Sequence, residues 1–113
     1  MLLGSTMKPN HSEKLKNNEE SIGLSGESRF NYMLMDELVE FFKSEDYKKY
    51  KGVVDFVSND VVKLQDIKDY MGSTTKLGKF IYENSLDFSN PIFKLNKKYN
   101  KSSFDRIKQY YGK

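Results

Sequence analysis

Apolar and polar residues alternate with helical spacing over residues 30–43, and this pattern predicts a first amphipathic helix. Its apolar positions recur every three or four residues, and acidic residues take the opposite face. Ser28 is the expected N-cap. A short second helix is expected over residues 45–50, with Gly52 at its C-terminal stop. The apolar positions of the first helix are Phe30, Met33, Leu34, Leu38, Phe41 and Phe42.

A helix, a polar turn and another helix are predicted over residues 64–84. The first helix spans residues 65–71 and ends at Gly72, because a left-handed C-terminal residue is easiest for glycine. Ser73 or Thr74 caps the second helix. The inward positions are Leu64, Ile67, Tyr70 and Met71 in the first helix, then Leu77, Phe80 and Ile81 in the second.

The remaining C-terminal residues predict a short edge strand and a closing helix. Pro91 suits the start of an edge strand, residues 92–95 roughly alternate, and residues 96–101 form a basic loop or hairpin tip. Ser102 and Ser103 cap the last helix, whose inward residues include Ile107. Residues 53–57 are apolar and β-branched, which fits either a short strand or a buried helical turn.

Residues 1–26 are polar and rich in Gly, Ser and Asn, and we expect them to form a disordered N-terminal tail. The ordered domain is then expected over residues 27–113. Its fold class is expected to be mainly α with a small β-hairpin.

The chain has no cysteine, so it cannot form a thiolate metal site. Its one histidine, His11, lies in the polar N-terminal segment, so we expect neither a histidine-rich metal site nor a Ser/His/Asp triad. We find no phosphate-binding glycine loop and no catalytic carboxylate pair. The expectation is a protein that is not an enzyme and needs no metal or cofactor. The apolar runs are too short to cross a membrane, and the absence of cysteine suits the cytoplasm.

The formal charge of +3 hides two halves of opposite sign. Residues 26–60 hold five basic and eight acidic residues, a net charge of −3, whereas residues 63–113 hold eleven basic and five acidic residues, a net charge of +6. Such asymmetry favours a polyanionic partner. The excess of Lys, Asn, Tyr, Phe and Ile is typical of a low-GC bacterium or its mobile genetic elements.

The stretch LQDIKDYMGSTTKLGKFI (residues 64–81) resembles the helix-turn-helix of small winged-helix regulators and excisionase-type proteins. The resemblance implies a winged helix-turn-helix, with a strand over residues 53–57, a wing over 92–101 and a closing helix. It also implies non-catalytic DNA binding in regulation, recombination or replication. The turn after Gly72 is one residue shorter than usual, and Gly78 falls inside the second helix, where it either marks a later helix start or permits a close backbone approach.

The expected DNA-binding residues fall in two groups. Lys76 and Lys79 would lie in or beside the major groove, while Thr74 and Thr75 would bind a phosphate at the helix N-terminus. The wing would contact phosphates through Lys94, Lys97, Lys98 and Lys101.

Two other functions remain open. Tyr99 among these lysines could stack on an unpaired base, as in a single-stranded-DNA-binding accessory subunit of a mobile element's replication complex, or it could pack on the core. Alternatively, the acidic helix and the tyrosines of residues 30–50 could bind a protein partner, as in an adaptor or inhibitor.

Overall fold

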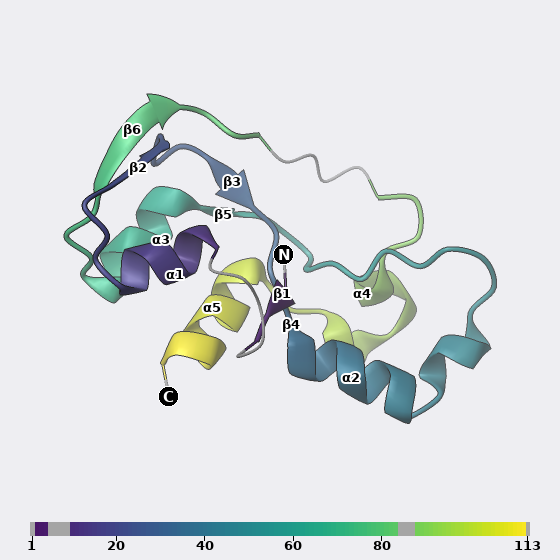
Figure 1. Ribbon diagram of the computed structural model, residues 1–113. Coiled ribbons are helices and arrows are strands. Elements are labelled where there is room, and N and C mark those ends of the chain that lie inside the picture. Colours follow the sequence, from purple (N-terminus) through teal and green to yellow (C-terminus); the bar gives the residue numbers. More distant parts are fainter. Residues whose placement is uncertain (1, 5–9, 84–87, 113) are drawn as a thin grey trace.

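The computed structural model describes residues 2–4, 10–83 and 88–112, which form an elongated molecule of 45 × 28 × 20 Å. It combines short helices with short strands, so the expected combination of helices with a small β component is confirmed in this general form (Figure 1). The helices are α1 (His11–Lys16), α2 (Met35–Lys43), α3 (Leu64–Met71), α4 (Ile92–Leu95) and α5 (Ser103–Tyr111), with 3₁₀ turns η1 (Asp46–Lys49) and η2 (Lys97–Tyr99).

The strands of the described residues pair in three two-stranded sheets. β1 (Leu2–Leu3) lies parallel to β4 (Met33–Leu34), and β2 (Ser21–Leu24) lies parallel to β6 (Lys76–Phe80). β3 (Arg29–Phe30) is antiparallel to β5 (Val62–Lys63). Every pair joins segments far apart in sequence, so no hairpin of consecutive strands exists among the described residues.

Two apolar clusters form the core. The larger lies among α1, α3, α5 and strands β1 to β5 and contains Leu15, Ile67 and Ile107, each without exposed surface. The smaller lies between α2, α4 and η2 around Phe41, Ile92 and Tyr99. Figure 1 shows β2, β6, α1 and α3 at one end of the molecule and α2 with α4 at the other.

The prediction of a disordered tail over residues 1–26 is corrected by the structure. Residues 1 and 5–9 lie outside the described ones, but Leu3, Leu15 and Ile22 are all buried in the larger cluster. Asn10 caps α1 by accepting a hydrogen bond from the Ser12 amide at 2.9 Å. The few apolar residues of this segment are therefore placed to complete the core, and the domain begins before residue 27.

The prediction of a second helix in a helix-turn-helix is wrong, because residues 76–80 form strand β6. Its sequence KLGKF fits a strand as well as a helix, and the pairing that decides between them comes from β2, in the supposed tail. A winged helix-turn-helix is therefore not formed by these residues.

Four smaller predictions also change. Residues 92–101 contain the helical segments α4 and η2 instead of a hairpin wing. Helix α2 begins at Met35, because residues 29–30 and 33–34 are strands. Residues 53–57 form no strand, only an isolated bridge between Asp55 and Pro91. Ser28 does not cap the helix, since its side chain bonds the Phe80 carbonyl and the Tyr82 amide.

Locally encoded features are confirmed. α3 ends at Gly72, which has the left-handed φ of 62°. The Ser102 side chain caps α5 by accepting a hydrogen bond from the Asp105 amide at 3.0 Å.

Candidate nucleic-acid interface

Strand β6 presents two lysines and a phenylalanine to solvent. Lys76, Lys79 and Phe80 are exposed, and Phe80 keeps 67% of its surface accessible. No ion pair in the described part of the chain joins either lysine. β6 lies at the outer edge of its sheet, since β2 is its sole partner among the described strands (Figure 1).

Gly78 is where β6 approaches β2 most closely. A Cβ on Gly78 would lie 2.3 Å from the Gly23 carbonyl oxygen, which no side chain could tolerate without a backbone shift. The register between β2 and β6 shifts at this point, because Ile22 pairs with Leu77 but Leu24 pairs with Phe80. Of the two explanations that the sequence offered for Gly78, the close approach of another backbone is thus confirmed, although Gly78 lies in a strand and not in a helix.

The backbone after β6 is fixed to residues 25–30. The Phe80 carbonyl accepts hydrogen bonds from the Ser25 amide at 2.6 Å and the Ser28 hydroxyl at 3.2 Å. The Tyr82 ring stacks on Phe30 with centroids 5.2 Å apart and planes tilted by 6°. The exposed residues 80–82 are therefore held on a rigid support.

Thr74 and Thr75 do not lie at a helix N-terminus. The Thr74 amide donates to the Asn18 Oδ1 at 2.9 Å, and Thr75 is fully buried, with its amide 3.3 Å from Ser73 Oγ. Both backbone amides are occupied by protein acceptors. The two threonines join the start of β6 to the loop after α1, and we leave them out of the interface.

The predicted wing lysines separate into two kinds. Lys94, Lys97 and Lys101 are exposed, and no ion pair of the described residues involves them. Lys98 is paired with Glu40 of α2. In contrast, Tyr99 has no exposed surface and packs edge-on against Phe41 and Phe56, with centroids 5.9 and 5.3 Å away. Tyr99 is a core residue, so base stacking by its ring would require the smaller cluster to open.

Arg106 holds the chain around these lysines in place. Its guanidinium is fully buried and binds both oxygens of Glu37, through Nε at 2.6 Å and Nη2 at 2.9 Å. Its remaining N–H groups reach the Lys101 carbonyl at 2.7 Å, the Tyr99 carbonyl at 3.0 Å and the Ser58 hydroxyl at 3.1 Å. All five N–H donors of the side chain are used.

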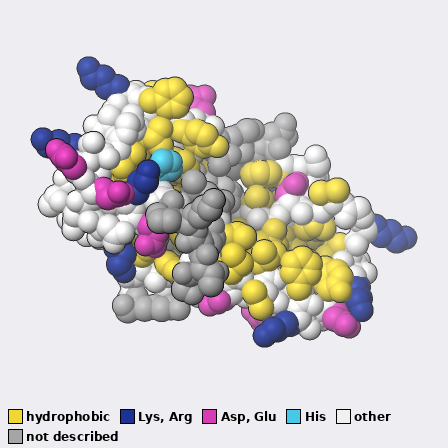
Figure 2. Space-filling model, in the orientation of Figure 1, with side chains coloured by type: hydrophobic (Ala, Val, Ile, Leu, Met, Phe, Trp, Pro, Cys, Tyr) yellow, Lys and Arg dark blue, Asp and Glu magenta, His cyan; other side chains and the backbone are white. Residues whose placement is uncertain are grey.

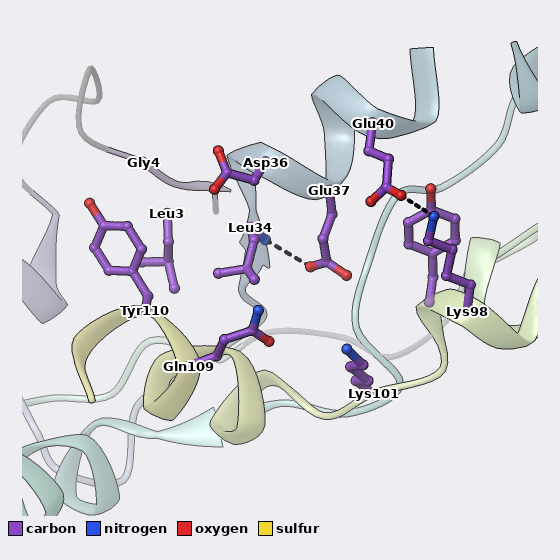
Figure 3. Close-up of a pocket in the computed structure, with 11 residues that line it drawn as sticks. Leu3, Gly4, Leu34, Asp36, Glu37, Glu40, Lys98, Lys101, Gln109 and Tyr110 are labelled. Atoms are coloured by element: carbon purple, nitrogen blue, oxygen red, sulfur yellow. Dashed lines mark hydrogen bonds and ion pairs between the residues drawn. The ribbon is translucent and has the colours of Figure 1, made fainter. Parts of the chain in front are cut away.

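Beside this network lies a polar pocket of about 390 Å³ between α2, η2 and α5 (Figure 3). Figure 3 shows Glu37 bonded to the backbone amide of Leu34 and Glu40 paired with Lys98. Three carboxylates share the pocket with two lysines, so its charge is largely balanced internally. The lining residues that carry charge are Asp36, Glu37, Glu40, Lys98 and Lys101.

Hydroxyl groups cluster where α1 meets α5. Ser12 Oγ lies 2.7 Å from the Tyr111 hydroxyl, which donates to Glu13 Oε1 at 2.6 Å. Burial, followed by this bond to Glu13, raises the pKa of the Tyr111 phenol. The His11 ring packs against Phe30 with centroids 5.3 Å apart and planes tilted by 39°. Burial, then nearby Lys14, lowers the pKa of its imidazole. These contacts join α1 to the domain, and Ser12 is too buried to react with a solute.

Within the described residues no group of three or more His, Cys, Asp or Glu side chains could hold a metal ion. None of the helices described here is long and apolar enough to cross a lipid bilayer.

Sequence reasoning missed the roles of Phe80, which it assigned to the core, and of Arg106, which it counted only among the basic residues of the C-terminal half. The signal for Phe80 was its place directly after Lys79 in a segment that also fits a strand. No local signal could identify Arg106, because its partners Glu37 and Ser58 lie 69 and 48 residues away.

No known protein family matches the chain, and no curated protein matches its sequence.

Proposed function

We propose that the protein binds nucleic acid without catalysing a reaction, through the exposed surface of β6. The observation that carries the proposal is the pair Lys76 and Lys79, both exposed and outside any ion pair of the described residues, on an open edge strand. A two-stranded β-ribbon can serve in place of a helix for contact with nucleic acid. Lysine charges on such a ribbon would bind phosphates.

A second set of exposed lysines supports the same proposal. Lys94, Lys97 and Lys101 are exposed as well and follow β6 in the basic half of the sequence, residues 63–113. They are expected to raise the rate and strength of binding by long-range attraction, since contacts with phosphates need no base-specific geometry. Whether the role is regulation, recombination or replication, this electrostatic contribution would be common to all three.

A salt titration tests the proposal. Fluorescence anisotropy with a labelled oligonucleotide of about 20 residues, single-stranded or duplex, measures Kobs between about 50 and 200 mM salt. Each phosphate contact adds about −0.7 to the slope of log Kobs against log salt on single strands and about −0.9 on duplex. We expect K76Q/K79Q to reduce the slope by about 1.4 to 1.8.

The matched control is K43Q/K51Q, which removes two exposed lysines that form no ion pair among the described residues and lie at the end of the molecule away from β6 (Figure 1). It should leave the slope almost unchanged. If neither form of DNA binds at the lowest salt, or if both double variants reduce the slope equally, the β6 interface is wrong.

A protein-binding role is the second candidate, favoured by exposed apolar residues on α2 and η1. Val39, Phe42 and Tyr47 remain 43%, 54% and 40% exposed. Figure 2 shows hydrophobic side chains at the surface near α2 as well as near β6. The acidic character expected of this helix is reduced, however, because Glu37 and Glu40 are paired with Arg106 and Lys98. This role would be favoured if the wild-type protein binds neither form of DNA and binds a protein partner in a way that F42A abolishes.

A further inference from the structure

Phe80 is an exposed aromatic ring with no aromatic partner in the described part of the molecule. Its neighbour in the same segment, Tyr82, has one face covered by Phe30. Phe80 keeps two thirds of its surface in solvent. Ile81 and Tyr82, which follow it, are 50% and 46% exposed, so Phe80 belongs to a run of three exposed apolar side chains, and a contiguous apolar patch is a feature of interaction sites.

The backbone that carries Phe80 is held in place by hydrogen bonds. Its carbonyl is bound from both Ser25 and Ser28, and the following amide of Tyr82 is bound by the Ser28 hydroxyl at 3.0 Å. A ring on an ordered backbone has few rotamers to lose on binding, and this limits the entropic cost of a stacking contact.

Positive and negative charges lie on opposite sides of Phe80. Lys79 is adjacent to Phe80 in sequence, and Lys76 lies about 13 Å from Phe80 along the strand, from a rise of about 3.3 Å per residue. On the far side, Glu27 and Glu83 line a shallow pocket with Arg29, and Glu27 is paired with Lys63 at 3.2 Å. A polyanion is therefore expected to follow β6 toward Lys76 and to end near Phe80.

We propose that this interface takes single-stranded nucleic acid, with an unpaired base stacked on Phe80 and adjacent phosphates bound by Lys79 and Lys76. The proposal rests on the nucleic-acid function given above and specifies its substrate class. Bases in a duplex already stack on their neighbours, so an aromatic platform gains little from them. An unpaired base presents a free π-face, and lysines beside an aromatic ring are the usual means of binding it.

Four variants at two phenylalanines test the proposal. Affinities are measured by anisotropy for an oligothymidylate of about 20 nucleotides and for a duplex of equal length. Stacking of one base on an aromatic ring predicts that F80A weakens single-strand binding by about 5- to 150-fold. F80L should weaken it similarly, because leucine keeps an apolar side chain but no ring, whereas F80Y should retain it.

F42A is the matched control, since Phe42 is also more than half exposed but lies on α2. It should bind single strands within about two-fold of the wild type, and circular dichroism should show that every variant is folded. Tight duplex binding that exceeds single-strand binding, or an F80L affinity equal to that of the wild type, would overturn single-strand stacking while leaving the lysine interface intact. Absence of binding to both DNA forms would overturn both proposals.

Discussion

Replacement of Arg106 is expected to be among the most destabilising single changes in the chain. Arg106 is fully buried, and its guanidinium bonds both Glu37 oxygens, the carbonyls of Lys101 and Tyr99, and the Ser58 hydroxyl. R106M would fill much of the same volume with apolar atoms. It would leave the Glu37 carboxylate, whose side chain is 13% exposed, without its counter-charge.

The expected magnitude follows from the partners that are lost. Removing one member of a buried ion pair costs about 3–5 kcal/mol of unfolding free energy, because the remaining charge stays desolvated. The whole unfolding free energy of a native domain is about 5–15 kcal/mol, so this loss is a large part of it. The double variant R106M/E37M removes both charges and should recover part of the loss, but the carbonyls of Lys101 and Tyr99 would still lack their donor.

Urea denaturation followed by circular dichroism measures these free energies for the wild type, both single variants and the double variant. K108M on the same helix is the control, because Lys108 is exposed and its loss should change stability by no more than about 0.5 kcal/mol. An R106M variant within about 1 kcal/mol of the wild type, or single-variant losses that simply add in the double variant, would refute the buried network.

Two further predictions concern the segment before residue 27. L15A should lower the unfolding free energy by about 2–5 kcal/mol, since Leu15 is fully buried. The control E19A, in the exposed loop nearby, should have little effect. Equal effects of the two variants in urea denaturation would show that this segment is a disordered tail after all. The imidazole pKa of His11 is lowered from 6.5, so the neutral form is favoured in the folded state. Its contribution to stability is present above that pH and is lost as the pH falls through the lower folded pKa, and H11F, which keeps a ring against Phe30, should show a shallower loss than the wild type.

Elements fixed by adjacent residues were predictable from the sequence. The end of α3 at Gly72 and the start of α5 at Ser102 each depend on a residue with a strong local preference. The apolar positions of α5 also follow helical spacing, and Ile107 is buried as expected. These predictions needed no knowledge of what the helices pack against.

Strand β6 could not be predicted in the same way because its partner is remote. Lys76 pairs with Ser21, and Phe80 with Leu24, across more than fifty residues of sequence. Leu77, Phe80 and Ile81 have a spacing that fits one face of a helix, and the glycine between them was the local sign against it. Only the approach of Gly78 to the Gly23 carbonyl explains why glycine is needed there.

The opposite charges of the two halves acquire a different meaning once the fold is known. Part of the asymmetry is cancelled by ion pairs between the halves, in which Arg106, Lys98 and Lys63 meet Glu37, Glu40 and Glu27. A charge count therefore overstates the basic surface, and it gave weight to residues that stabilise the fold. The lysines that are exposed and take part in no ion pair of the described residues are the ones available to a polyanion. Two of them lie on the strand that ends in Phe80. It is this remainder, and not the total charge, that makes nucleic acid the partner to test first. In the basic half it comprises Lys76, Lys79, Lys94, Lys97, Lys101 and Lys108.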